Sequence, residues 1–363
     1  MRLVLAGGGT GGHLFPAVAL AQTLLAQDSG SEVLFVGTER GLEQRMLPKL
    51  GLPLETVDMV GLVGRGLKGK LQIVPKLVKS FVQSRRLLRR FQPDCVIGVG
   101  GYASVPVLLA AKTMAVPYLI HEQNALPGLS NRLLGKNAEL VCLSFPDSGE
   151  GFRGATTLVT GNPLRPGLET IAPELPEPGS LLIFGGSRGA RAINQAVMEM
   201  LPRLREWPEC PRILHQTGEE DLEDVRRAYR DAGFDPGQVV AFIDDMATAY
   251  TAASLVICRA GATTLAELTA SGRPAILIPF PYAAADHQTA NARALEQAGA
   301  ACLLPQSELT PERLAEQVKV LLADRQKLQN MAECGRKLGL PGAAERILAE
   351  CRRLLDGPVT EAG

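Results

Sequence analysis

The sequence is poor in aromatic residues and carries no net charge, and each shortage excludes a class of protein. Phe, Trp and Tyr make up 4% of the 363 residues while glycine occurs 38 times. This balance favours an α/β protein with tight strand–helix turns over a β-sandwich. Lys and Arg together number 38, as do Asp and Glu, which argues against a general nucleic-acid binder. With 46% hydrophobic and 21% charged residues, disorder, collagen and coiled coil are excluded as dominant structures.

The cysteines lack the spacing of a metal site or a disulfide framework. There are seven, an odd number, and no CxxC occurs, so we expect reduced, buried thiols. The apolar run before the first glycines is only four residues long, too short for the core of a signal peptide. No run reaches the ~18 apolar residues of a membrane span. We therefore expect a soluble protein of the cytoplasm.

Short apolar runs alternate with amphipathic stretches along the chain, which predicts parallel sheets covered by helices. The expected strands are Leu3–Ala6, Val33–Val36, Cys95–Val99, Tyr118–Ile120, Leu140–Leu143, Leu181–Phe184, Ile213–His215, Leu255–Ile257, Ala275–Ile278 and Ala301–Leu303. The expected helices between them are Leu14–Gln27, Ala190–Leu204, Ala262–Ser271, Gln288–Ala298 and Pro311–Ala323.

The pattern restarts in the middle of the chain. Residues 163–180 contain five prolines and little periodicity, as in a linker, and a strand that runs into glycines follows them. We predict two doubly wound domains, 1–163 and 181–363, joined by a linker over 164–180, with the last helix packing back on the first domain. Ligands of such sheets bind outside the carboxyl ends of the strands, so we expect the site in a central cleft.

Glycine-rich turns follow three of the predicted strands. They are Gly7–Gly12, Gly100–Gly101 with Tyr102, and Gly185–Gly186 with Gly189. Glycine lets the backbone approach a phosphate, and the helix that follows aims its N–H groups at the anion. A single turn of this kind has an ordinary structural alternative. Three in the same setting indicate two phosphate-bearing ligands, or one ligand with a diphosphate at each domain.

The first turn also matches the GxGxxG pattern of dinucleotide-dependent oxidoreductases. That function requires an acid at the end of the second strand to hold the ribose. Here the strand ends in glycine and threonine, and Glu39 comes later than usual. No GxxxxGK[ST] sequence occurs, which excludes a P-loop.

Longer motifs extend through most of the chain, from about residue 3 to residue 300. They read GGGTGGHLFPAVALA, GVGGYASVPVLLAA, HEQNALPGLSNRLL, TGNPLR, FGGSRGARAIN, FIDDMATAY, CRAGATTLAEL and GRPAILIPFPYAAADHQTANA. In this order they resemble the signatures of the MurG family, transferases that add N-acetylglucosamine to lipid I in peptidoglycan synthesis. The resemblance implies the GT-B fold, two Rossmann-like domains facing a central cleft. It also implies an inverting transfer from UDP-N-acetylglucosamine to lipid I, giving lipid II without a cofactor or metal.

The same resemblance assigns roles to residues of both domains. His13, where the first turn becomes a helix, is the general base for the acceptor hydroxyl or a contact to the donor sugar; its alternative is a helix-capping histidine. Glu267 accepts hydrogen bonds from the ribose hydroxyls of UDP. The other donor-binding positions are Thr10, Gly11, Gly12, Asn124, Arg165, Ser187, Ile243, Ala262, Thr263, Thr264 and Gln288, and the acceptor-binding positions are Gly100, Gly101 and Tyr102.

Several of these side chains have plain structural alternatives. Arg165 has the alternative of a surface ion pair, and Tyr102 that of ordinary packing. Asp244 and Asp245 are interpreted as a helix N-terminus and not as a metal site. Glu122 is expected to orient its loop.

The zero net charge is the sum of two unequal halves. Residues 1–163 carry 17 basic and 11 acidic side chains, a net of +6, and the remainder carries 21 and 27, a net of −6. Within the first half, residues 68–90 form a basic amphipathic segment typical of contact with an anionic membrane surface. Its alternative is a helix packed on the sheet with solvated charges. Phe81 is the single aromatic residue among these charges, and nucleic-acid binding requires several interleaved with them.

We therefore predict a peripheral enzyme at the cytoplasmic face of the cell membrane. Its expected partners are UDP-N-acetylglucosamine, lipid I, the anionic membrane surface and other cell-wall synthesis proteins. Three alternatives stay open: another GT-B glycolipid transferase or UDP-sugar epimerase, a dinucleotide-dependent oxidoreductase, and a UDP-sugar-binding module without turnover.

Overall fold

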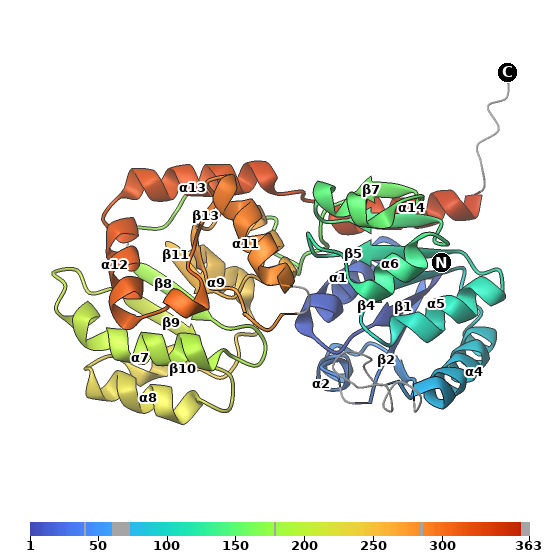
Figure 1. Ribbon diagram of the computed structural model, residues 1–363, viewed down its shortest axis with the longest axis horizontal. Helices are drawn as coiled ribbons and strands as arrows, with labels where there is room; N and C mark the ends of the chain where they lie inside the picture. The colour runs from blue at the N-terminus through green and yellow to red at the C-terminus, as the bar shows by residue number, and fades with distance from the viewer. Residues whose placement is uncertain (40, 60–72, 178, 284–285, 357–363) are drawn as a thin grey trace, which may run out of the picture. The chain divides into compact units, whose positions relative to one another are not determined.

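The computed structural model describes residues 1–39, 41–59, 73–177, 179–283 and 286–356 of the chain. It contains two compact units (Figure 1), Met1–Arg165 with Leu340–Gly363, and Pro166–Gly339. Most of the segment predicted as a linker belongs to the second unit, where Leu168 and Leu175 are buried. The chain therefore leaves the first unit after Arg165 and returns to it at Leu340.

The first unit is built on a sheet of seven parallel strands. In spatial order they are β3 (Leu54–Thr56), β2 (Glu32–Gly37), β1 (Arg2–Gly7), β4 (Cys95–Gly100), β5 (Tyr118–Glu122), β6 (Leu140–Leu143) and β7 (Thr157–Val159). The central strands are continuous apolar runs because helices cover the sheet on both faces.

Alternation along β1 decides which helices lie on each face of this sheet. Leu3 and Leu5 share a core with α1 (Gly11–Gln27) and α14 (Ala343–Asp356). Val4 and Ala6 share the opposite core with α4 (Ile73–Phe91), α5 (Ser104–Thr113) and α6 (Leu129–Gly135). The short elements are α2 (Glu43–Met46), η1 (Pro48–Leu50) and η2 (Pro146–Phe152).

The second unit is built on a sheet of six parallel strands. In spatial order they are β10 (Val239–Val240), β9 (Arg212–Gln216), β8 (Ser180–Phe184), β11 (Leu255–Cys258), β12 (Ala275–Leu277) and β13 (Ala301–Leu303). Its helices are α7 (Arg191–Arg205), α8 (Leu222–Asp231), α9 (Met246–Ala252), α10 (Ala262–Ser271), α11 (His287–Gln297), α12 (Pro311–Leu322) and α13 (Arg325–Leu338), with η3 (Pro236–Gln238) and η5 (Gln306–Glu308).

The strand order of each sheet reverses at one point, between β1 and β4 in the first unit and between β8 and β11 in the second. Ligands of doubly wound sheets bind outside the carboxyl ends of the strands at such a reversal. The glycine turns of residues 7–12 and 100–102 follow β1 and β4, and that of residues 185–189 follows β8. Each predicted turn therefore lies at the carboxyl ends of the strands beside the reversal point of its own sheet, where ligands of doubly wound sheets bind.

All ten predicted strands are present, with ends within two residues of the prediction. The strands that the sequence pattern missed, β3, β7 and β10, contain three, three and two residues and lie at the sheet edges. Runs this short leave no periodic signal. Within the described part of the chain, none of the helices combines the length and the apolar character needed to cross a membrane.

Candidate functional site

The turns after β1 and β4 fit against each other in the first unit. A Cβ atom on Gly7 would lie 2.3 Å from the carbonyl oxygen of Gly100, and one on Gly101 would lie 2.7 Å from that of Gly8. All four residues also have positive φ angles, from +81° to +147°, which favour glycine. Backbone packing between the two turns therefore requires glycine here, independently of any ligand.

His13 lies at this junction, in the first turn of α1. Its Nδ1 atom is 3.3 Å from the hydroxyl oxygen of Thr10, the residue that precedes α1. A Cβ on Gly100 would lie 3.0 Å from the imidazole Cδ2 atom, so the ring is beside the β4 turn. The structure thus gathers Thr10, Gly11, Gly12, His13, Gly100, Gly101 and the 37%-exposed Tyr102 at the reversal point of one sheet.

Glu43 is a buried carboxylate that the sequence analysis missed. It is 1% exposed and accepts hydrogen bonds from the backbone N–H of Gly9 at 2.8 Å and of Thr38 at 2.9 Å. The hydroxyl of Thr38 donates a third, at 3.2 Å. The signal available in the sequence was a glutamate that follows Gly37 and Gly41, shortly after β2, the strand that pairs with β1.

A second buried carboxylate organises the loop after β5. Glu122 accepts from the backbone N–H groups of Asn124 and Gly128, both at 3.0 Å, and from the side-chain amide of Asn131 at 2.9 Å. The expected orienting role of Glu122 is confirmed. The neighbouring His121 is buried, and burial lowers its pKa to about 4, so this imidazole is neutral near pH 7.

Arg165 ends the first unit, and its guanidinium lies over the ring of Phe15, 4.7 Å from the centroid. Phe15 follows His13 by two residues on α1. A cation stacked on an aromatic face is held in place without losing its hydrogen-bonding capacity. The arginine is thus held close to the histidine's helix.

The glycine turn of the second unit fits against the end of β9. A Cβ on Gly189 would lie 1.7 Å from the carbonyl oxygen of Thr217, and the side-chain amide of Gln216 donates to the carbonyl oxygen of Gly186 at 2.8 Å. Ser187 is half-buried in this turn. As in the first unit, the glycines serve the packing of two neighbouring loops.

Helix α10 follows β11, the strand on the other side of this reversal point. Ala262 and Thr263 are buried in its first turn and Thr264 is half-buried. Glu267, one turn further, is 1% exposed and accepts a hydrogen bond from the Tyr250 hydroxyl at 3.0 Å. Glu267 is therefore not a solvated glutamate on the outer face of the helix.

Two neighbouring predictions concern the segment before α9. The side chain of Ile243 is 8% exposed, so it is part of the core and only its backbone is suited to a ligand. Asp245 caps α9 by accepting the hydroxyl of Thr248 at 2.6 Å and the backbone N–H of Thr248 at 3.0 Å, and these two bonds lower the pKa of its carboxyl. The interpretation of this acid as a helix N-terminus is confirmed.

A cavity of about 400 Å³ lies beside the glycine turn of the second unit. Gln288 lies in its wall, and its side-chain oxygen accepts the backbone N–H of Phe280 at 2.9 Å. The wall is formed by Gly185, Gly189, Ala190, Arg191, Ala192, Arg259, Phe280, Gln288 and Gln306. The cavity therefore connects the glycine turn with Gln288, a predicted donor-binding residue.

Arg259 is the other site residue that the sequence analysis missed. It follows β11 directly and is 8% exposed. Its guanidinium donates to the carbonyl oxygens of Ile278 and Pro279, at 3.1 and 3.0 Å, and to the side-chain oxygen of Gln306 at 2.7 Å. Burial lowers its pKa to about 10. The signal available in the sequence was a charged residue that directly follows a strongly apolar strand.

Replacing Arg259 by lysine should destabilise the second unit by about 2–4 kcal/mol, because an ammonium cannot reproduce the planar fork and leaves buried carbonyls unpaired. Thermal unfolding measures the loss. Arg325→Lys is the matched control, since Arg325 pairs with Glu177 at an exposed position and its loss should cost less than about 1 kcal/mol. Equal melting temperatures for both variants would contradict the prediction.

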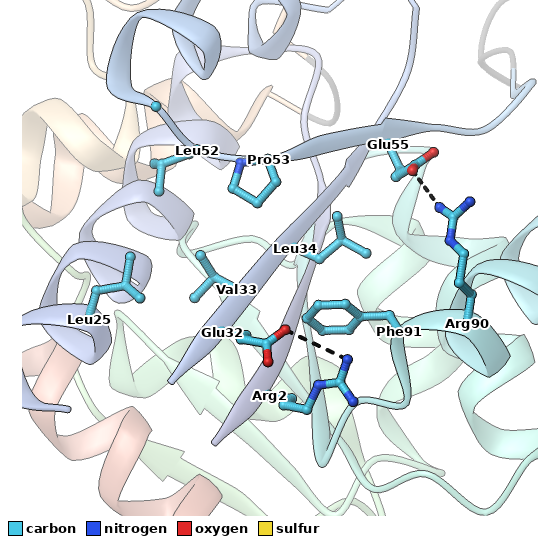
Figure 2. Close-up of a pocket in the computed structure, with 11 residues that line it drawn as sticks. Arg2, Leu25, Glu32, Val33, Leu34, Leu52, Pro53, Glu55, Arg90 and Phe91 are labelled. Carbon is cyan, nitrogen blue, oxygen red and sulfur yellow. Dashed lines mark hydrogen bonds and ion pairs between the residues drawn. The ribbon is translucent and has the colours of Figure 1, made fainter. Parts of the chain in front are cut away.

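A larger cavity, of about 570 Å³, lies at the opposite end of the first sheet. Figure 2 shows that its wall includes Arg2 and Glu32, the first residues of β1 and β2, with ion pairs from Arg2 to Glu32 and from Arg90 to Glu55. The glycine turns are at the carboxyl ends of the strands, so this cavity is separate from them.

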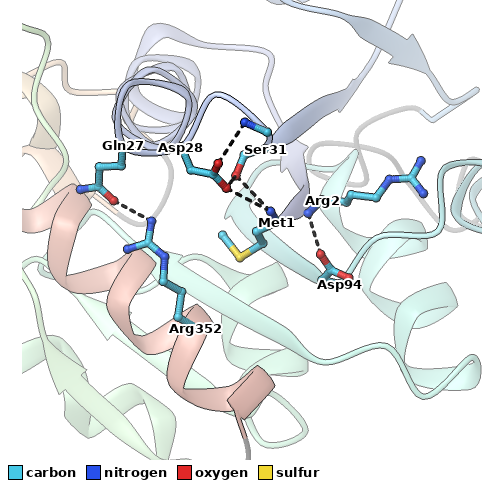
Figure 3. Close-up of polar contacts among 8 residues, drawn as sticks. Met1, Arg2, Gln27, Asp28, Ser31, Asp94 and Arg352 are labelled. Carbon is cyan, nitrogen blue, oxygen red and sulfur yellow. Dashed lines mark hydrogen bonds and ion pairs between the residues drawn. The ribbon is translucent and has the colours of Figure 1, made fainter.

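Local contacts hold that end of the sheet together (Figure 3). The amino group of Met1 donates to the Ser31 hydroxyl at 3.0 Å, and Arg352 of α14 donates to the side chain of Gln27 at 2.7 Å. These bonds join the chain start and α14 to α1 and β2. They lie at the amino ends of the strands, away from the glycine turns at the carboxyl ends.

Comparison with known proteins assigns the family. The glycosyltransferase family 28 N-terminal domain matches residues 3–142, and the C-terminal domain of the same family matches residues 180–347. The chain belongs to glycosyltransferase family 28. The predicted GT-B fold and the enzyme class, a glycosyltransferase, are thereby confirmed.

Individual relatives are similar to this chain over nearly its whole length. A protein of Syntrophotalea carbinolica named UDP-N-acetylglucosamine--N-acetylmuramyl-(pentapeptide) pyrophosphoryl-undecaprenol N-acetylglucosamine transferase is 58% identical, over 98% of this chain and 99% of the relative. A protein of Geobacter metallireducens with the same name is 49% identical, over 96% and 98%. The crystal structure of Acinetobacter baumannii MurG has a TM-score of 0.76 at 35% identity, covering 97% and 99% of the two chains. The resemblance to the MurG family is confirmed.

A solved structure described as a putative UDP-N-acetylglucosamine 2-epimerase from Listeria monocytogenes is also similar, with a TM-score of 0.65 over 96% of this chain and 94% of that one. Its sequence is only 16% identical. This likeness shows a shared fold and nothing about the reaction.

Proposed function

We propose that this transferase moves N-acetylglucosamine from UDP-N-acetylglucosamine to lipid I, forming lipid II and UDP with inversion at the anomeric carbon. The observation that carries the proposal is the full-length similarity to identically named transferases, at up to 58% identity among those compared. The two ligand-binding reversal points fit it, because donor and acceptor each carry a diphosphate and each sheet offers glycine turns there.

In this proposal the second unit binds the donor. Glu267 accepts the ribose hydroxyls, since a carboxylate can take two bonds from a vicinal diol. Ser187 and the first turn of α10, Ala262–Thr264, meet the diphosphate. The backbone of Ile243 contacts uracil, and Gln288 reads the sugar hydroxyls. Charge develops on UDP as the glycosidic bond breaks, and the positive end of the α10 dipole is suited to stabilise it.

The first unit binds the acceptor through Gly100, Gly101 and Tyr102, and supplies the base. His13 accepts the proton of the attacking sugar hydroxyl while the oxygen attacks the anomeric carbon from the face opposite UDP. Thr10, Gly11, Gly12, Asn124 and Arg165 complete the contacts to the donor. Imidazole is the side chain that most often serves as a general base.

The test is transfer of radiolabelled N-acetylglucosamine to a lipid I analogue. Labelled lipid-linked disaccharide and one equivalent of UDP are expected only when donor and acceptor are both present. UDP-sugar turnover without an acceptor would favour an epimerase, and donor binding without product would favour a binding module.

The oxidoreductase alternative is disfavoured by the end of β2. That chemistry needs a carboxylate there to hold a ribose, but the buried carboxylate at this position, Glu43, already accepts bonds from Gly9 and Thr38. A titration that shows no binding of NADH or NADPH is the expected result.

We further propose that the enzyme works at the cytoplasmic face of the membrane, docked through the segment 68–90. Residues 68–72 lie outside the described part of the chain. The remainder lies within α4, which buries Leu87 and Leu88 in the core and leaves Val78 58% and Val82 41% exposed. Its exposed cations Lys76, Arg86 and Arg89 accompany these valines. One side of the helix thus serves the core and another is suited to an anionic surface.

Replacing Lys76, Arg86 and Arg89 together by glutamine should weaken binding to phosphatidylserine-containing vesicles by roughly 10²-fold, because each basic residue near such a surface contributes about 1 kcal/mol. Sedimentation with vesicles measures the change. Arg203, Arg227 and Arg325 of the second unit, replaced together by glutamine, form the control and should leave binding unchanged. Equal loss in both triple variants would contradict docking through α4.

A further inference from the structure

The glycines around Glu43 make room for its carboxylate. A Cβ on Gly37 would lie 2.7 Å from Oε1 of Glu43, one on Gly41 would lie 2.0 Å from Oε2, and one on Gly8 would lie 2.7 Å from Oε1. Gly37 and Gly41 do not have the left-handed φ angles that favour glycine. At these two positions the buried carboxylate, and not the backbone conformation, excludes a larger residue.

The location of this charge is unfavourable for ligand binding by itself. Glu43 binds the N–H of Gly9, in the turn whose neighbourhood is proposed to meet an anionic diphosphate. A carboxylate there repels the ligand and occupies an N–H group that a phosphate would use. Its contribution must therefore be geometric, through the turn that it holds.

We propose that Glu43 is a positioning residue for His13 and the acceptor-binding turns, an inference that rests on the proposed function. The carboxylate joins the β1 turn, through Gly9, to the end of β2, through Thr38. Thr10, the residue after Gly9, contacts the His13 imidazole, and that ring lies against Gly100 of the β4 turn. Glu43 thus fixes the segment that sets where the proton acceptor stands relative to the acceptor-binding glycines.

Glu43→Gln tests this role because the amide keeps the size of the side chain and one accepting oxygen. The oxygen is expected to stay at the position that accepts two bonds from Thr38, so the NH2 group faces Gly9 and cannot accept its N–H. We expect kcat/KM for the lipid I analogue to fall by about 10- to 100-fold, as for a catalytic group displaced by a fraction of an ångström to 1 Å. The dissociation constant of UDP should stay unchanged, and amide hydrogen exchange at Gly9 should become faster.

Glu32→Gln is the matched control, since Glu32 is an exposed carboxylate at the other end of β2 and its removal should change none of these quantities. If Glu43→Gln is too unstable to assay, Gly37→Ala replaces it, because the added methyl displaces the carboxylate while keeping its charge. In a Glu43→Ala background, Gly37→Ala should cause no further loss of activity, because the carboxylate that the added methyl would clash with is absent.

Wild-type acceptor kinetics in Glu43→Gln, or tighter acceptor binding from loss of the negative charge alone, would overturn the proposal. Full additivity of Gly37→Ala and Glu43→Ala would do the same. If the wild-type protein itself forms no product, the proposed function fails instead. Unchanged hydrogen exchange at Gly9 in Glu43→Gln would then still refute the positioning role.

Discussion

Replacement of His13 by alanine is expected to lower kcat for lipid II formation by about 10²- to 10⁴-fold, the usual contribution of a general base. Binding of UDP should be unaffected, because the residues proposed to hold the nucleotide belong to the second unit. The measurement is the radiolabelled transfer assay with saturating donor, accompanied by calorimetric titration with UDP. Full turnover in His13→Ala would refute the base assignment.

A second variant separates the two roles left open for this histidine. Asparagine retains hydrogen-bonding groups but cannot accept a proton near pH 7. A base role predicts that His13→Asn is as impaired as His13→Ala and that both lose the acidic limb of the kcat/KM profile. A role limited to contacting the donor sugar predicts substantial turnover in His13→Asn, with the acidic limb kept.

Replacement of Glu267 by alanine is expected to raise the donor KM by roughly 10²-fold or more, since two hydrogen bonds to a charged group contribute about 1.5–3 kcal/mol each. The variant also removes the acceptor of the buried Tyr250 hydroxyl, so some loss of stability accompanies it. UDP titration measures the binding change directly. Kinetics with varied lipid I analogue should show an unchanged acceptor KM.

Tyr250→Phe is the control that isolates this structural part. It removes the hydroxyl that donates to Glu267 and leaves the carboxylate in place. A small effect on donor KM in Tyr250→Phe, beside a large one in Glu267→Ala, is the expected pair of results. A Tyr250→Phe defect as large as that of Glu267→Ala would assign the carboxylate to packing and not to the ribose.

The two missed residues show which information local patterns lack. Glu43 and Arg259 each come after a strand, and each has a glycine within three residues of it in the sequence. Nothing in the immediate sequence of either residue indicates that it is buried. The bond from Gly9 to Glu43 spans 34 residues, and that from Arg259 to Gln306 spans 47. A charged side chain is buried only when such distant partners satisfy it, so the fold and not the local pattern decides its environment.

The C-terminal helix illustrates the same limit. Ile347, Leu348 and Cys351 carry an ordinary amphipathic pattern, typical of a helix on any sheet. In the structure α14 packs beside α1, and Arg352 donates to a residue 325 positions away. The pattern therefore indicates that a helix forms, and the expectation that this helix packs back on the first domain does not follow from the pattern itself.

By itself the sequence determined the two parallel sheets, the three glycine turns at their carboxyl ends and the family motifs. Strand runs and helix periods are local, and parallel strands joined by helices have few possible arrangements. Only the tertiary structure decided why the glycines are there. Gly7 and Gly189 allow neighbouring loops to touch, and Gly37 makes room for a carboxylate. Such close approaches join segments far apart in the chain, where no local pattern reaches.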